Sequence, residues 1–111
     1  MFFRGVDSGK GDRVKLAELS YLFPEIIDAK FPAWDLTKTE YFLKIHANGS
    51  YFKEIEHLKY KYLLSLDGHT CAWLRVPWIM LSSSILVKTE TNKLEWFYHK
   101  IKPYVHYVPI Q

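Results

Sequence analysis

The sequence KYKYLLSLDGHTCAWLRVPWIM, residues 59–80, decides the fold, because it reads as a strand, a loop and a helix in succession. Between residues 60 and 66, Tyr and Leu recur at every second position, which predicts a pleated strand with one face well buried and the other partly buried. Asp67 and Gly68 end this strand, since glycine allows a backbone turn or a close ligand approach that a Cβ would resist. The sequence therefore predicts a buried strand whose carboxyl end runs into a tight loop.

An apolar run with helical spacing follows this loop. Pro77 cannot lie deep in a helix, because it has no N–H and its ring clashes with the preceding turn. The helix must therefore begin just before Pro77, which places Arg75 in its first turn. A first turn carries unpaired backbone N–H groups and the positive end of the helix dipole, where α/β proteins often hold a phosphate. We expect Arg75 to lie at an anion site.

The rest of the chain continues the alternation of strands and helices. The predicted strands lie at residues 2–3, 25–30, 60–66, 85–88 and 104–110. The predicted helices lie at residues 13–21, 37–46, 75–81 and 94–101. This order predicts an α/β fold, a Rossmann-like parallel sheet with helices on its faces.

Composition and charge limit the class of protein. The 111 residues have room for one domain, and 49% hydrophobic with 17% aromatic residues suffice for a packed core. Fifteen basic and twelve acidic side chains give a net charge of only +3, which argues against a nucleic-acid surface but suits a pocket for a phosphorylated ligand. No stretch approaches the roughly 20 apolar residues of a membrane span. We expect no nucleic-acid partner and no membrane span in this segment.

Two arginines follow predicted strands. The loop at residues 5–11, GVDSGKG, has neither the GxGxxG nor the GxxxxGK[ST] spacing, so the dinucleotide and P-loop interpretations have little support. Arg13 begins the helix after this loop, as Arg75 begins the helix after the next one. Because a guanidinium suits phosphate and open α/β sheets bind ligands at this edge, the pair indicates an anion site. The alternative is that both are solvated surface residues.

Other candidates have simpler explanations. Cys71 lies two residues from His69, but no second Cys or spaced His pair completes a zinc site. A small apolar filler is the simplest interpretation of Cys71. A group of aromatic residues could stack on a sugar or a base, although packing against the sheet explains their spacing as well. The group consists of Trp96, Phe97, Tyr98 and Tyr104.

Five sequence blocks, in order along nearly the whole chain, carry a family resemblance. They are FFRG (residues 2–5) followed by Arg13, DA (28–29), KYKYLLSLDG (59–68), WLRVPWIMLSSSILVK (73–88) and EWFYHKIKPYVHYVPI (95–110). Together they resemble the CAP-type glycosyltransferases, glycosyltransferase family ninety. That family contains the lipopolysaccharide-modifying proteins, fungal capsule xylosyltransferases and Rumi-like protein O-glucosyltransferases.

The resemblance implies a GT-B glycosyltransferase with two Rossmann-like domains. Such an enzyme transfers a sugar, glucose or xylose, from a UDP-sugar to a hydroxyl of a protein or glycan acceptor, without a metal or other cofactor. Residues 1–111 would then be most of the second, donor-binding domain, with the first domain and the C-terminal helices absent. For a eukaryotic protein, the resemblance implies the lumen of the endoplasmic reticulum or Golgi. A catalytically inactive sugar-nucleotide-binding or scaffold module remains the alternative.

The resemblance also implies donor-binding residues. The residue after FRG is often a hydroxyl residue in the family, and Val6 here cannot bond a nucleotide through its side chain. This departure permits the inactive alternative. The general base is expected upstream of Met1, so no catalytic residue is assigned, and Asp67 is more simply a turn residue. The family's remaining donor contacts correspond to Arg13, His69, Thr70, Cys71, Ala72, Trp73 and Arg75.

Overall fold

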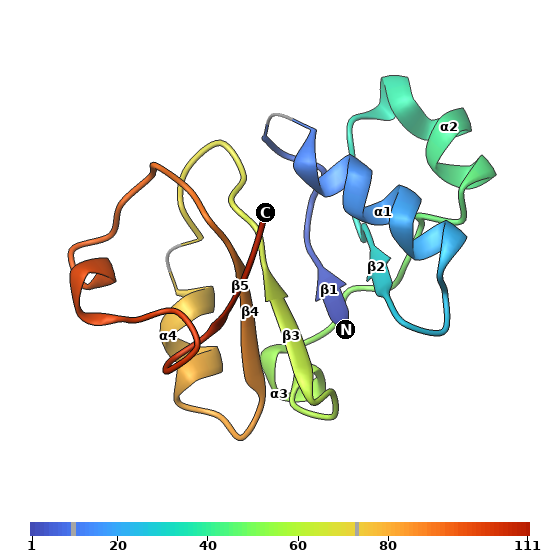
Figure 1. Cartoon of the computed structure of the whole chain (residues 1–111). Coiled ribbons are helices and arrows are strands. Elements are labelled where there is room, and N and C mark those ends of the chain that lie inside the picture. Colours follow the sequence, from blue (N-terminus) through green and yellow to red (C-terminus); the bar gives the residue numbers. More distant parts are fainter. Residues whose placement is uncertain (10, 73) are drawn as a thin grey trace.

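The computed structural model describes residues 1–9, 11–72 and 74–111. Its strands form one parallel sheet in the order β2-β1-β3-β4-β5 (Figure 1). The strands are β1 (Phe2–Arg4), β2 (Asp28–Lys30), β3 (Tyr62–Ser65), β4 (Ile85–Thr89) and β5 (Val108–Ile110). The predicted Rossmann-like α/β class is confirmed.

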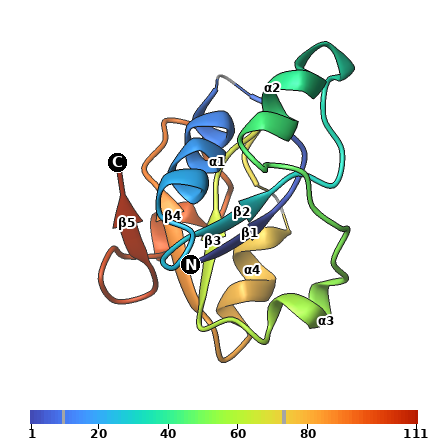
Figure 2. The same ribbon diagram turned by 90° about the vertical axis from the view of Figure 1, so that its right-hand side faces the viewer.

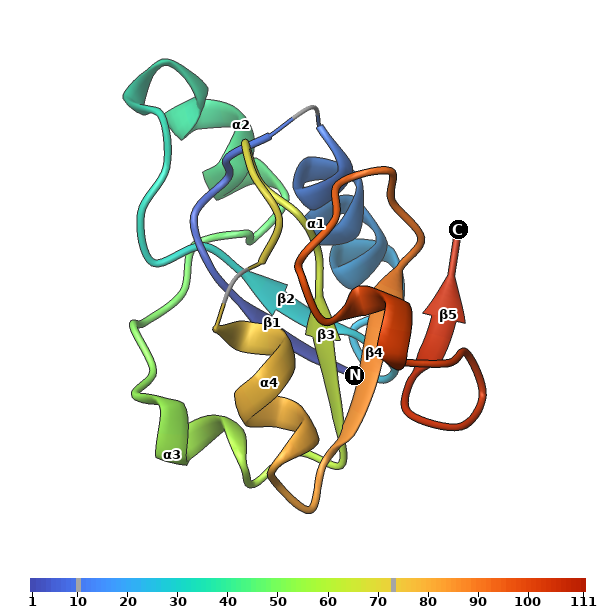
Figure 3. The same cartoon turned by 90° about the vertical axis from the view of Figure 1, so that its left-hand side faces the viewer.

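Helices connect these strands and lie on both faces of the sheet (Figures 2 and 3). They are α1 (Asp12–Leu22), α2 (Thr39–Lys44), α3 (Glu54–His57) and α4 (Arg75–Met80), with 3₁₀ turns η1 (Leu36–Lys38) and η2 (Tyr98–Lys100). The predicted start of a helix at Arg75 is confirmed. None of the described helices has the length and apolarity to cross a membrane.

Two hydrophobic cores lie on opposite faces of the sheet. Successive residues of a strand point to opposite faces, so Phe3 and Phe2 enter different cores. Phe3 packs in the cluster that contains Leu16 of α1, and Phe2 packs in the cluster that contains Ile79 of α4. Each helix therefore holds one face of the same short strands.

Strand β3 is buried on both faces, and here the expectation of one partly buried face is wrong. Leu63 and Leu64 are 1% and 0% exposed and belong to opposite cores. The reason is that the crossover connections of a parallel sheet place helices over both faces of a central strand.

The C-terminal third departs most from expectation. Of the helix predicted over residues 94–101, only η2 is present, and Leu94 and Trp96 are 76% and 77% exposed. Phe97, Tyr98 and Ile101 pack against the core, but Leu94 and Trp96 do not, and a helix turn without such packing has little to stabilise it. The last strand also begins late, at Val108, because Tyr104 has a φ of +60° and its N–H bonds to the carbonyl of Tyr107, which closes a turn.

Strand β2 and the region after it are also shorter than predicted. The strand expected over residues 25–30 begins at Asp28, since Ile27 is held in a turn by its bond to the carbonyl of Phe23. The helical piece expected over residues 37–46 is divided into η1 and α2.

Candidate functional site

The sheet changes direction between β1 and β3. The chain goes from β1 through α1 to β2 on one side, and from β3 through α4 to β4 on the other. In the described residues β1 and β3 share one register pair, Phe2 with Leu63, and the strands diverge beyond it (Figure 1). Open α/β sheets bind ligands in the crevice at the carboxyl ends of two strands placed in this way.

Two loops meet at the carboxyl ends of β1 and β3, one that follows β1 and contains Gly9, and one that follows β3 and contains Gly68. Gly9, at φ +102°, lies so close to Gly68 that an added Cβ would be 3.0 Å from the Gly68 carbonyl carbon. A Cβ on Gly68 would be 2.5 Å from Oγ of Ser8. Only glycine allows the two backbones to approach this closely.

Arg13 joins the two loops. Its Nη1 donates to the Val6 carbonyl at 2.9 Å and to Oγ of Ser8 at 3.0 Å, and its Nη2 donates to the Leu66 carbonyl at 2.9 Å. Burial lowers the pKa of Arg13, and the nearby Asp67 carboxylate opposes that shift. The Arg13 guanidinium thus donates hydrogen bonds to the carbonyls of Val6 and Leu66, which lie just beyond the ends of β1 and β3.

Arg75 makes a second connection between β1 and β3. Its Nη2 donates to the Arg4 carbonyl at 2.5 Å, and its Nη1 donates to the Leu64 carbonyl at 3.4 Å. Burial, followed by repulsion from Arg13, lowers the pKa of Arg75 to about 10. Arg75 is therefore still charged at neutral pH. Its side chain reaches back to the strand ends, instead of lying over the first turn of α4.

The two guanidiniums lie against the same ring. The central carbon of Arg13 is 5.4 Å from the centroid of Phe3, and that of Arg75 is 5.0 Å from it. Each guanidinium has five N–H donors, and the contacts among the described residues leave some of them unused in both cases. This arrangement concentrates positive charge where a phosphate would meet it with several donors.

The loop after β3 is held by polar contacts. Asp67 accepts a bond from the Ala72 N–H at 3.1 Å, which confirms Asp67 as a turn residue. Lys93 donates to the carbonyls of Gly68 and His69 at 2.7 and 3.1 Å. The sequence gives no signal for Lys93, because it lies 25 residues further along the chain from Gly68.

The other predicted donor contacts lie in this loop with different exposures. The side chains of His69 and Thr70 are exposed, whereas Cys71 and Ala72 are half-buried. Cys71 Sγ is 2.7 Å from Glu95 Oε1, and this hydrogen bond is the main cause that raises the pKa of the thiol. Trp73 lies outside the described residues. The structure thus brings Arg13 and Arg75 together at the carboxyl ends of β1 and β3, where the loop that contains residues 69–72 begins.

A cavity of about 520 Å³ opens beside this loop. Asp67 and Gly68 line it from the loop after β3, Lys15 lines it from α1, and Thr89 and Ile110 line it from the carboxyl ends of β4 and β5. This volume lies within the range of small-molecule sites. Among the described residues, no three His, Cys, Asp or Glu side chains are grouped as metal ligands would be.

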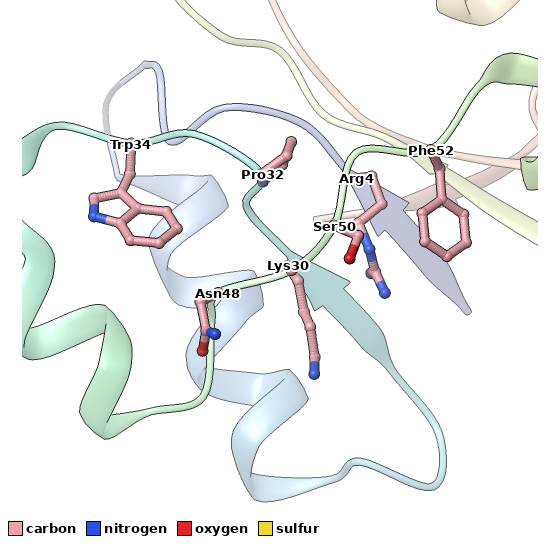
Figure 4. Close-up of a pocket in the computed structure, with 8 residues that line it drawn as sticks. Arg4, Lys30, Pro32, Trp34, Asn48, Ser50 and Phe52 are labelled. Atoms are coloured by element: carbon pink, nitrogen blue, oxygen red, sulfur yellow. The ribbon is translucent and has the colours of Figure 1, made fainter.

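A second cavity, of about 530 Å³, lies beyond the carboxyl ends of β1 and β2. Figure 4 shows Trp34 and Phe52 at its two ends, with Arg4 and Lys30 between them. Arg4 is 8% exposed and pairs with Asp28 at 2.8 Å. The side chain of Arg4 therefore belongs to this cavity, and only its carbonyl faces Arg75. The sequence motifs did not indicate this cavity.

The sheet order and the loops at its switch point define a Rossmann-like α/β protein. The family model described as glycosyl transferase family 90 matches residues 1–111. The chain belongs to glycosyl transferase family 90.

Curated relatives agree with this family. Protein O-glucosyltransferase 3 of Mus musculus is 36% identical over 110 residues, which cover 99% of this chain and 21% of the relative. Protein O-glucosyltransferase 2 of Danio rerio is 30% identical and protein O-glucosyltransferase 1 of Homo sapiens is 32% identical, again over 99% of this chain. The chain spans 21% of the length of the Danio rerio relative and 28% of the length of the Homo sapiens relative.

Proposed function

We propose that this chain is the donor-binding part of a glycosyltransferase that transfers a sugar from a UDP-sugar to a hydroxyl of a protein. Family membership and relatives named protein O-glucosyltransferases support the reaction class. The observation that carries the donor assignment is the pair of guanidiniums at the switch point of the sheet. Glucose is the first sugar to test, because the relatives' names specify glucosyl transfer, and xylose is the second.

Arg13 and Arg75 would act on the diphosphate of the donor. When the bond between the anomeric carbon and the phosphate oxygen breaks, negative charge grows on that oxygen and leaves with UDP. Guanidiniums already fixed by bonds to backbone carbonyls need no reorganisation at that moment, so they stabilise the transition state more than the bound UDP-sugar. In this proposal two arginines supply the positive charge that a metal would otherwise provide.

The acceptor hydroxyl must lose its proton as it attacks the anomeric carbon. The proposal places that general base outside residues 1–111 and assigns no such role to Asp67. Oδ1 of Asp67 accepts the Ala72 N–H within its own loop, which is the role of a turn residue. The contribution of this chain is then donor binding and leaving-group stabilisation.

The experiment uses the full-length protein that contains this chain. Calorimetry with UDP tests donor binding. A second assay measures the release of UDP from UDP-glucose or UDP-xylose in the presence of a protein acceptor and EDTA, and it tests transfer without a metal. Binding with acceptor-dependent UDP release supports the enzyme. Binding without release supports the alternative, an inactive sugar-nucleotide-binding module, which the exposed apolar Val6 also permits. Absence of UDP binding would overturn the donor assignment.

A further inference from the structure

Lys88 is a buried lysine that the proposed mechanism does not use. It lies on β4, is 5% exposed, and follows the apolar residues Leu86 and Val87. No carboxylate of the described residues forms an ion pair with its ammonium. A buried charge without a counter-ion is costly, so the surroundings of Lys88 must account for it.

Aromatic rings and one carbonyl surround this ammonium. Nζ donates to the Thr89 carbonyl at 2.9 Å and lies 4.5 Å from the ring centroid of Tyr98 and 5.9 Å from that of Tyr107. An ammonium has three donors, and the bond to Thr89 uses one of them. The other two are available to a hydrogen-bond acceptor.

The hydroxyl of Tyr98 is a second buried polar group without a partner among the described residues. Tyr98 begins η2, which lies over β4 (Figure 3). Burial raises the pKa of Tyr98, so the phenol keeps its proton and remains a donor. Burial lowers the pKa of Lys88, while the Asp67 carboxylate opposes that shift.

These two groups line a cavity of about 310 Å³ at the carboxyl end of β4. The wall of this cavity also includes Tyr107, Glu90 and Thr91. Glu90 would repel an anionic ligand and Lys88 would repel a cationic one, so the wall of this cavity favours a neutral ligand. Hydroxyl groups can accept from Lys88 and also exchange hydrogen bonds with Tyr98 and Thr91, and the tyrosine rings offer apolar faces to C–H groups.

We propose that this cavity binds a neutral sugar ring through two neighbouring hydroxyl groups that contact Lys88 and Tyr98. The inference rests on the proposed function, because a UDP-sugar contains two such rings, the ribose and the transferred hexose. The cavity is next to the donor loop, since Lys93 and Glu95, which follow β4, bond to Gly68 and Cys71 of that loop. A donor whose diphosphate lies at the arginine pair would carry its sugar rings in this neighbourhood.

The test compares three ligands by calorimetry on the full-length protein: UDP, 2′-deoxy-UDP and UDP-glucose. The variants are Lys88→Met, which keeps the shape of the side chain, and Tyr98→Phe, which removes one oxygen and serves if Lys88→Met does not fold. Tyr104→Phe is the matched control, because that side chain is 83% exposed and lies outside the cavity. We expect Kd to rise about tenfold in each cavity variant, as for the loss of one hydrogen bond, and to stay within about twofold in the control.

The pattern of losses identifies the ring. Weaker binding of UDP-glucose alone assigns the cavity to the hexose. Weaker binding of UDP and UDP-glucose with little change for 2′-deoxy-UDP assigns it to the ribose. Equal losses for all three ligands in both cavity variants, or no loss in either variant, would overturn this inference. The proposed function would still stand if the wild-type protein binds UDP. A wild-type protein that binds none of the ligands would overturn both.

Discussion

Gly9 and Gly68 come from loops 59 residues apart in the chain, and their backbones touch, with only 3.0 Å between the place of a Gly9 Cβ and the Gly68 carbonyl carbon. This contact joins the loops that follow β1 and β3. Gly9 also has a left-handed conformation, with φ at +102°. The donor site we propose is therefore built on a backbone contact that a side chain would prevent.

Gly9→Ala should destabilise the protein through both effects. A residue with a Cβ in the left-handed region costs about 1–2 kcal/mol, and the contact with Gly68 adds to that cost. Gly11→Ala is the matched control, because Gly11 has φ +97° but nothing within 4 Å of its Cβ position. Urea unfolding of the full-length protein should show a larger loss for Gly9→Ala. Equal losses in the two variants would contradict a close contact between the loops.

Arg75→Ala should affect both folding and turnover. The carbonyls of Arg4 and Leu64 would lose a charged donor, which should lower the free energy of unfolding by about 2–3 kcal/mol. Loss of a fixed donor to the leaving group should lower kcat by about 100-fold or more. Steady-state kinetics with UDP-glucose and urea unfolding measure the two effects.

Arg75→Lys separates the two roles of this side chain. It keeps the charge but lacks the planar fork that reaches two carbonyls, so we expect intermediate stability and partial activity. Turnover close to wild type in Arg75→Ala would contradict a role in stabilising the diphosphate.

His57 should make stability depend on pH. Its side chain is 5% exposed and contacts Phe2, Phe52 and Trp78, and burial and the charge of Arg75 lower its pKa. The folded state therefore binds a proton less readily than the unfolded state. Stability should be highest above the ordinary histidine pKa of about 6.5 and should fall as the pH drops through that value.

The variant His57→Leu should reduce this pH dependence between about pH 7.5 and 5.5. His99→Leu is the control, because His99 is exposed. Urea unfolding at several pH values measures the slope. The same slope in the wild type and in His57→Leu would show that other groups cause the pH dependence.

UDP should slow hydrogen exchange in two regions together. Residues 11–14 form the start of α1, and residues 69–75 lead from β3 into α4; Arg13 links the two regions through its bonds to Ser8 and Leu66. Exchange of the full-length protein with and without UDP should therefore show protection at both places, and binding should weaken as salt rises. Protection confined to residues 104–110, or equal protection by ATP, would count against a uridine-specific site at the arginine pair.

The sequence by itself determined the local elements and their order. Alternation of apolar residues identified β3, and Pro77, which is tolerated only in the first turn of a helix, placed the start of α4 close to Arg75. The motif blocks identified the family. Each of these signals depends on residues close together in the chain, where spacing translates directly into geometry.

Tertiary structure alone decided where the polar side chains go. Arg75 reaches back to Arg4 and Leu64, Lys93 bonds a loop 25 residues away, and Lys88 is buried in a strand that reads as apolar up to that point. The helix predicted over residues 94–101 is reduced to a 3₁₀ turn, in which Phe97, Tyr98 and Ile101 pack against the core while Leu94 and Trp96 stay exposed. These outcomes depend on how distant segments meet, and the spacing of residues within one segment carries no information about that.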